Sequence, residues 1–258
     1  MRKDIQFLGT VVSRFTLQDL TASVASYIEN NCLRAIISNH NLHSIFVFHR
    51  DPVMREFYEA SDICHFDGMG AVWIARLLGN RVNGTNRITY VDWIWSVMER
   101  ASKSGWKIYF VGGRPGVAER AGKVFQTRFG AIQFSGRDGF FNAVAGSADN
   151  LAVLKQIREY QPNLLIVGMG MPRQERWILE NLEQIEANVI LQAGACMDYV
   201  AGVVPTPPRW MGRAGLEWLY RFAFEPRRLA IRYLVEPWFV AWWVVMALLR
   251  GEHSWRVR

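Results

Sequence analysis

Short apolar runs alternate with segments of helix length over most of the chain, and this alternation constrains the fold more than any other feature. The runs suit buried strands and lie at residues 5–8, 35–37, 63–66, 108–111, 164–167 and 189–191. The longer segments suit helices and lie at residues 17–27, 91–102, 115–129 and 172–182. This order predicts an α/β fold with a mostly parallel, Rossmann-like sheet flanked by helices.

The pattern changes after Gly202, where Pro205, Pro207 and Pro208 interrupt it. We therefore predict an α/β core at residues 1–202 and a helical appendage at residues 203–258. The appendage holds nine Arg against four Glu, and six of the eleven Trp. Arg and Trp together suit an anionic membrane surface, so the appendage is predicted to bind one. A nucleic-acid partner is not expected, because no Lys/Arg run with regular aromatic spacing occurs.

Residues 238–249 are the most apolar part of the appendage. They number about a dozen, fewer than the roughly 20 that a spanning helix needs, and Glu236 and Pro237 are predicted to stop the helix from extending backwards. The segment is therefore expected to lie in the interface of the membrane, which makes the protein peripheral. The alternatives are a buried helix or a contact between two copies, so formation of a homo-oligomer stays open.

The cysteines indicate the compartment. Cys32, Cys64 and Cys196 are scattered and fit neither a disulfide framework nor a zinc site, so a reducing cytoplasm is expected and no metal is predicted. Residues 1–3 resemble the start of a signal peptide. No long apolar segment follows Asp4, so the N-terminus is predicted to belong to the fold.

Three predicted strands run into glycine-rich turns, and ligands of open α/β sheets bind at such carboxyl ends. In the first turn Gly112, Gly113 and Arg114 precede a helix and suit a phosphate. The spacing differs from the dinucleotide fingerprint, and a plain tight turn explains these residues equally well.

The second turn contains Gly168, Gly170, Gln174 and Glu175. Two glycines allow a ligand to approach the backbone, and Gln174 offers a donor and an acceptor to a base or a sugar. Glu175 can instead complement the helix dipole. A nucleotide site is the favoured interpretation of this turn.

The third turn begins with Asp67, directly after a buried strand. Its carboxylate can cap a helix or can take a proton from an attacking hydroxyl, and the residues alone support both roles. Asn39, Asn41 and His43 follow another strand, where amides and imidazoles can hold sugar hydroxyls or serve as polar caps.

The succession of these segments resembles the WecG/TagA/CpsF glycosyltransferases over nearly the whole chain. The segments that carry the resemblance are residues 67–70, 112–116, 168–175 and 216–228. The resemblance implies an inverting transfer, without a metal, from a UDP-sugar to an undecaprenyl-diphosphate-linked sugar at the cytoplasmic face of the bacterial inner membrane. Exopolysaccharide, teichoic acid and enterobacterial antigen synthesis are all compatible with it.

The resemblance also implies roles for individual residues. Asp67 is expected to be the general base, Asn41 its neighbour in the pocket, and Gln174 part of the nucleotide site. Arginines of the appendage are expected to stabilise the diphosphate in place of a metal ion, and the candidates are Arg221, Arg228, Arg209, Arg213 and Arg232.

One residue departs from the family pattern. Members often carry Thr where this chain has Asn39, a position expected near the donor sugar, so the identity of that sugar stays open between N-acetylmannosamine, its uronic acid and glucose. A neutral sugar is favoured. The competing functions are a nucleotide-dependent Rossmann oxidoreductase or epimerase and a non-catalytic membrane scaffold; both lack a sequence motif of their own.

Overall fold

A computed structural model describes residues 4–251, apart from the side chain of Arg213. It contains one eight-stranded sheet in the order β1-β2-β4-β3-β8-β7-β5-β6, in which every neighbouring pair except β1–β2 is parallel. The strands are β1 (Asp4–Phe7), β2 (Thr10–Ser13), β3 (Ala35–His40), β4 (Ile63–Phe66), β5 (Lys107–Gly112), β6 (Gln133–Arg137), β7 (Leu164–Gly168) and β8 (Val189–Gln192). The predicted α/β fold with a mostly parallel sheet is confirmed.

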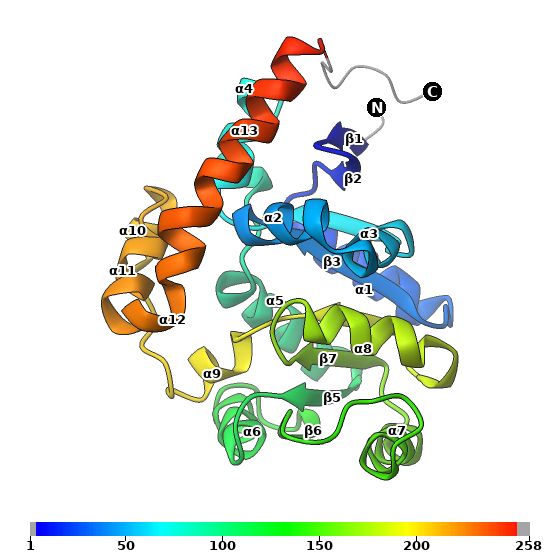
Figure 1. The fold of residues 1–258 in the computed structure, drawn as a ribbon. Coiled ribbons are helices and arrows are strands. Elements are labelled where there is room, and N and C mark those ends of the chain that lie inside the picture. Colours follow the sequence, from blue (N-terminus) through cyan, green and yellow to red (C-terminus); the bar gives the residue numbers. More distant parts are fainter. Residues whose placement is uncertain (1–3, 252–258) are drawn as a thin grey trace.

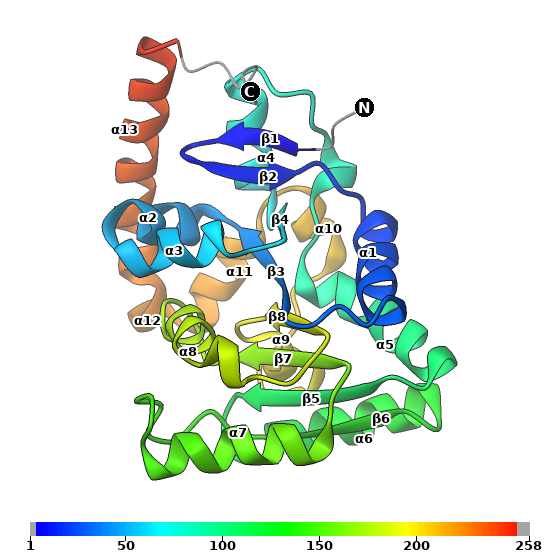
Figure 2. The ribbon, with the colours of Figure 1, turned by 90° about the vertical axis from the view of Figure 1, so that its right-hand side faces the viewer.

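Helices cover both faces of this sheet (Figures 1 and 2). They are α1 (Leu17–Glu29), α2 (Leu42–Arg50), α3 (Pro52–Glu59), α4 (Met69–Leu77), α5 (Tyr90–Ser104), α6 (Val117–Phe129), α7 (Ala148–Tyr160), α8 (Arg173–Asn181) and α9 (Cys196–Val200). The C-terminal part adds α10 (Arg209–Arg213), α11 (Glu217–Phe224), α12 (Pro226–Ala230), a π-helical turn (Ile231–Val235) and α13 (Glu236–Leu249). Two short 3₁₀ turns complete the set, at Gly84–Asn86 and Leu182–Gln184.

The strands are apolar throughout because both faces of the sheet are buried. In β7, Leu164 and Ile166 pack with α1, α5, α6 and α9 on one face, whereas Leu165 and Val167 pack with α3, α7 and α8 on the other. All four side chains are fully buried. A period-2 alternation of apolar and polar residues, which marks a half-exposed strand, is therefore absent from this strand.

The N-terminal strand differs from the prediction. Residue Leu8 does not extend β1 but forms a two-residue turn with Gly9, and the φ angles of 47° and 92° at these positions match a type I′ hairpin. The chain therefore doubles back and β1 lies antiparallel to β2 at the edge of the sheet. The sequence pattern also missed β6, because Ser135 and Gly136 interrupt its apolar character.

The C-terminal helix is longer than expected. Pro226–Leu249 is one helical stretch of 24 residues. By length and composition alone it could cross a membrane, and 22% of its most apolar 18 residues are buried. The prediction that Glu236 and Pro237 would stop the helix is wrong. A π-helical turn precedes them, the Glu236 amide donates to the carbonyl of Ile231, and Pro237 needs no partner for an amide hydrogen in the first turn of α13.

A third hydrophobic cluster joins the C-terminal helix to the N-terminal half of the chain. Val240, Val244 and Ala247 of α13 are buried there together with residues of β1, β2, α2 and α4. In Figure 1, α13 rises away from the sheet and α10, α11 and α12 lie beside its lower end. This packing places the arginines of the appendage opposite the carboxyl ends of the central strands. The boundary at residue 202 stays a prediction.

Candidate active site

A cavity of about 380 Å³ opens where β3, β4, β7 and β8 end. This is the edge at which open α/β sheets bind ligands, and here β3 lies next to β8, the last strand of the sheet in chain order. The core contributes one wall and helices α11 to α13 contribute the other. Among the residues that line it are Asn39, Asn41, His43, Asp67, Tyr90, Gln174, Tyr199, Glu217, Arg221, Arg228, Arg232 and Glu236.

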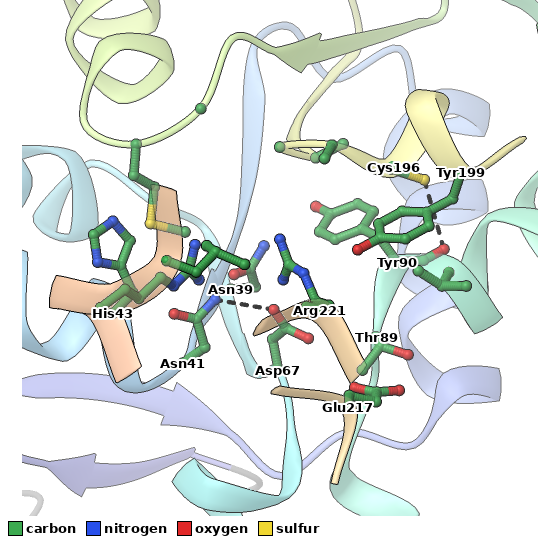
Figure 3. Close-up of a pocket in the computed structure, with 18 of the residues that line it drawn as sticks. Asn39, Asn41, His43, Asp67, Thr89, Tyr90, Cys196, Tyr199, Glu217 and Arg221 are labelled. Atoms are coloured by element: carbon green, nitrogen blue, oxygen red, sulfur yellow. Dashed lines mark hydrogen bonds between the residues drawn. The ribbon is translucent and has the colours of Figure 1, made fainter. Parts of the chain in front are cut away.

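Asp67 and Asn41 form a hydrogen-bonded pair on the core side (Figure 3). Asn41 caps α2, because its Oδ1 accepts from the Ser44 amide at 3.0 Å, and its Nδ2 donates to Oδ2 of Asp67 at 3.0 Å. The Asp67 carboxylate does not cap α4, whose N-cap is Gly68 without a side-chain hydrogen bond. Asp67 therefore does not serve as a helix cap. Its carboxylate instead faces the cavity.

Arginines form the opposite wall. Figure 3 shows the Arg221 guanidinium between Asp67 and the rings of Tyr90 and Tyr199. Burial by itself would lower the pKa of Arg221, but Tyr199 and other neighbours, Asp67 among them, raise it. Burial and the nearby Arg221 lower the pKa of Arg232. Two guanidinium groups thus share a confined space, which favours binding of an anion.

The other candidate arginines have different surroundings. Arg228 lines the cavity, is exposed and pairs with Glu225. Arg209 lines a smaller adjoining pocket and lies 3.7 Å from Asp92. The side chain of Arg213 lies outside the described part of the structure. The structure thus brings Arg221, Arg228 and Arg232 to the cavity.

Gln174 is fully buried and all of its polar atoms are engaged. Its Oε1 accepts from the amides of Gly170 and Gly194, each at 3.2 Å. Its Nε2 donates to Glu175 at 2.7 Å and to Gln192 at 3.1 Å. The side chain therefore holds together the two glycine loops that end β7 and β8. Gln174 touches the cavity but shapes its backbone wall through these bonds.

Glu175 lies beneath that wall rather than in it. It is fully buried, its Oε2 has no hydrogen-bond partner among residues 4–251, and burial raises its pKa from 4.5 to about 7. A carboxyl in such a place is most stable when protonated. The structure gives Glu175 no contact with the cavity.

The other predicted nucleotide residues also lie off this cavity. Gly112 packs against Gly168, and a Cβ at position 112 would come within 2.4 Å of the Gly168 carbonyl oxygen. The Gly113 amide donates to the same oxygen at 3.0 Å. These glycines therefore allow two strand ends to approach closely. Arg114 is exposed. Burial raises the pKa of Asp198, and the charge of Arg114 partly opposes that rise.

Two orphaned polar atoms mark the inner end of the cavity. Asn39 is 3% exposed and Tyr90 is 6% exposed, and both line the cavity. Within residues 4–251, Oδ1 of Asn39 and the hydroxyl of Tyr90 have no hydrogen-bond partner in good geometry, although Asn39 lies close enough to the hydroxyl to oppose the rise in its pKa that burial causes. A buried polar atom without a partner costs about 1–3 kcal/mol, so these atoms are placed to bind a polar ligand.

The sequence analysis missed two polar contacts that connect the core to the appendage. Arg87 pairs with Phe66, the residue that precedes Asp67 in the chain. Its Nη2 is 2.5 Å from Glu217 of α11. His43 Nδ1 is 2.7 Å from Glu236 of α13. Partners so distant in the sequence leave no local pattern. The acidic residues among the arginines of residues 216–236 are the one available signal.

Two of the other histidines have structural roles. His40 and His65 are fully buried, and burial lowers their pKa values to about 3 and about 4. Both are therefore neutral parts of the core at physiological pH. Over the part of the chain that the structure describes, no three His, Cys, Asp or Glu side chains converge to hold a metal ion.

The comparison with known sequences decides the family. Residues 5–254 match the glycosyl transferase WecG/TagA/CpsF family. The chain belongs to this family. Similar curated proteins are the N-acetylglucosaminyldiphosphoundecaprenol N-acetyl-beta-D-mannosaminyltransferases of Staphylococcus aureus strains NCTC 8325 / PS 47 and MRSA252. Each is 23% identical over 228 residues, which cover 87% of this chain and 86% of the relative.

Membership of the WecG/TagA/CpsF family makes this protein a glycosyltransferase. It settles the reaction class against the oxidoreductase and the scaffold. The predicted family resemblance over nearly the whole chain is confirmed, because the match begins in β1 and runs beyond the end of α13. The individual roles of the cavity residues stay proposals.

Proposed function

We propose that this glycosyltransferase moves a sugar from a UDP-sugar to an undecaprenyl-diphosphate-linked sugar, with inversion, at the cytoplasmic face of the bacterial inner membrane. Its product would enter a cell-surface polysaccharide of the exopolysaccharide, teichoic acid or enterobacterial antigen type. The observation that carries the proposal is one cavity in which the Asp67–Asn41 pair faces Arg221 and Arg232. A base and an anion site on opposite walls are what displacement of a nucleoside diphosphate requires.

The reaction follows from this arrangement. The acceptor hydroxyl attacks the anomeric carbon of the donor sugar while its proton passes to Asp67. A bond forms between that oxygen and the anomeric carbon, the bond from the anomeric carbon to the UDP oxygen breaks, and UDP departs from the opposite face. Asn41 donates to one carboxylate oxygen and leaves the other for the proton.

Negative charge grows on the departing diphosphate, and the guanidinium groups of Arg221 and Arg232 stabilise it. Both belong to the appendage, so the site is complete only when that part lies against the core. Arg228 lies closer to solvent and would meet the diphosphate of either substrate. Bidentate contacts make arginine better suited than lysine to this role.

The donor would lie along the glycine loops. Gly170 and Gly194 present backbone that Gln174 holds in place, and the orphaned atoms of Asn39 and Tyr90 suit hydroxyl groups of the donor sugar. Polar but uncharged partners at this end favour a neutral sugar over a uronic acid. The other predicted nucleotide residues would contribute to donor binding by shaping the strand ends; they are Gly112, Gly113, Arg114, Gly168 and Glu175.

We also propose a peripheral position at the membrane. Trp238 and Trp242 of α13 are 77% and 61% exposed, and they lie with Arg50 in a shallow aromatic pocket. Aromatic and arginine side chains of this kind suit the headgroup region. The same helical stretch directs Arg232 and Glu236 into the site, and charges in contact with an aqueous cavity oppose its insertion across the bilayer.

The test is transfer to a prenyl-diphosphate-linked sugar from a panel of radiolabelled donors, with UDP-glucose, UDP-N-acetylmannosamine and the corresponding uronic acid. Asp67→Asn is expected to reduce transfer by at least about 100-fold, because a general base is lost. The matched control is Asp138→Asn. Asp138 also follows a strand, β6, but its carboxylate accepts from the Phe140 amide at 2.8 Å and does not line the cavity. Equal activity of the two variants would refute Asp67 as the base.

A further inference from the structure

An apolar groove of about 560 Å³ leads away from the cavity between α4 and α13. The two spaces are continuous, because six polar residues line both of them: Asn41, His43, Asp67, Glu217, Arg221 and Arg232. Beyond these polar residues the lining is almost entirely apolar. It consists mainly of Leu42, Met69, Trp73, Ile74, Leu77, Trp218, Val240, Ala241, Val244, Val245 and Leu248.

The apolar walls of this groove are open to solvent. Trp73 and Leu77 on α4 are 49% and 63% exposed, and Val245 and Leu248 on α13 are 48% and 36% exposed. Two facing rows of exposed large apolar side chains are unusual for a surface that stays in water. Their polar neighbours lie at the end that meets Asp67. Polarity therefore falls along the groove from the reaction centre outwards.

The geometry points to one occupant: the prenyl chain of the lipid-linked acceptor, with its polar end at the junction between the groove and the cavity. This inference rests on the proposed function, because it concerns the acceptor of that reaction. An acceptor of this class has a sugar and a diphosphate at one end and a hydrocarbon chain at the other, in the same order as the polar and apolar parts of the two connected spaces.

The length of the groove agrees with this occupant. Helix α13 has 14 residues. At 1.5 Å per residue it spans about 21 Å, enough for about four isoprene units laid beside it. The rest of a longer chain would leave the groove at the far end of α13. Trp238 and Trp242 line a separate aromatic pocket on this helix, so the helix can meet the bilayer and the prenyl chain with different side chains.

A substitution can fill the groove without changing the cavity. Ala241 is exposed and lines the groove but not the cavity, so Ala241→Trp adds bulk where the prenyl chain would lie. The matched control is Ala152→Trp, on an exposed position of α7 at the far side of the sheet. Kinetics are measured with two acceptors that share the same diphosphate-sugar and carry either a long prenyl chain or one isoprene unit.

The expected result is a shift in KM that depends on chain length. Ala241→Trp is expected to raise KM for the long acceptor about tenfold and to leave kcat/KM for the short acceptor within about twofold. Ala152→Trp is expected to behave as the unaltered protein with both acceptors. An equal loss with both acceptors, or no loss with either, would overturn the inference.

A binding measurement keeps the test independent of transfer. Prenyl diphosphate with a diazirine at its hydrocarbon end is photolysed with the full-length protein, and labelled peptides are identified by mass spectrometry. We expect labels on α4 and on the Val245–Leu248 side of α13, and their loss in Ala241→Trp. Labels confined to other surfaces would overturn the inference even if transfer by the unaltered protein confirms the proposed function.

Other occupants give distinct outcomes. A diazirine phospholipid that labels the groove and is not displaced by prenyl diphosphate would assign the groove to bilayer acyl chains, against the inference. A dimer in light scattering that dissociates in Ala241→Trp would assign it to a second copy of the chain, also against it. If no donor supports transfer but prenyl diphosphate still labels the groove, the proposed function fails and the groove assignment to a prenyl chain stands.

Discussion

His43 Nδ1 lies 2.7 Å from Oε2 of Glu236, and this contact joins the start of α2 to the start of α13. The two side chains are 19% and 7% exposed. A polar contact with so little exposure differs from a surface contact, because removal of one member leaves a polar group of the other buried without its partner. The contact therefore connects the position of the appendage to the core within the site.

His43→Ala is accordingly expected to lower the free energy of unfolding by about 1–3 kcal/mol. In the double variant with Glu236→Gln, part of this loss should be recovered, because no unpaired carboxylate remains. Urea unfolding of the single and double variants measures the coupling. Lys103→Ala is the control, since its pair with Glu99 is largely exposed and should contribute little. Additive effects of the two substitutions would show that the contact does not stabilise the fold.

Asn41 has two functions that substitution can separate. Asn41→Ser keeps a hydroxyl that caps α2 but is too short to reach Asp67, whereas Asn41→Ala removes both contacts. We expect the alanine variant to lose about 1 kcal/mol of stability and the serine variant to lose only a few tenths. Both should lower kcat. Steady-state kinetics and urea unfolding measure the two effects; unchanged kcat in Asn41→Ser would mean that the bond to Asp67 does not assist transfer.

Glu175 predicts a specific dependence of stability on pH. Burial raises its pKa from 4.5 to about 7, so between these pH values the folded state keeps a proton that the unfolded state loses. Its stabilising contribution is complete below pH 4.5 and is lost as the pH rises through about 7. Glu175→Gln removes this titration while its amide oxygen still accepts from Gln174.

The measurement is the free energy of unfolding of both proteins at pH 4.5 and at pH 7.5. Relative to the unaltered protein, Glu175→Gln should gain about 2–3 kcal/mol between the lower and the higher pH. His40 and His65 change stability in the opposite direction, because burial lowers their pKa values. They are present in both proteins, so the difference isolates Glu175. A difference that is independent of pH would contradict the raised pKa.

The aromatic face of α13 predicts the strength of membrane association. Trp238→Ser with Trp242→Ser is expected to weaken binding to phosphatidylglycerol vesicles about tenfold or more, because two large apolar surfaces no longer enter the headgroup region. Phe140→Ser is the control, since Phe140 is 68% exposed but lies after β6, in another part of the molecule. Co-sedimentation measures the partition. Equal binding by all three proteins would place the membrane contact elsewhere.

The sequence pattern predicted six of the eight strands, four of the core helices and the position of the site along the chain. It did not predict β2, β6 or the helices α2, α3, α4, α7 and α9. Buried strands and amphipathic helices leave local patterns, because one strand or one helix turn is only a few residues long. The parallel arrangement followed from the order of those elements. Asp67, Asn41 and the arginines of the appendage were found through their position after strands or in the family motifs.

Tertiary structure decided what each of these residues contacts. Gln174 was predicted at the nucleotide site; it lines the cavity, and two of its four hydrogen bonds hold Gly170 and Gly194 in place. Gly112 was predicted either at a phosphate or in a tight turn, and the structure shows it close to the carbonyl of Gly168. In both positions the same residue type serves either role, and only the partner that the fold supplies distinguishes them.

The appendage shows the same limit at a larger scale. Pro237 predicted the end of a helix, yet the preceding π-helical turn carries the helix through it. The groove between α4 and α13 and the contacts of Glu217 with Arg87 and of Glu236 with His43 each join segments more than a hundred residues apart. The chain sequence encodes such contacts only through the complete fold, because their stability depends on burial and geometry rather than on local spacing.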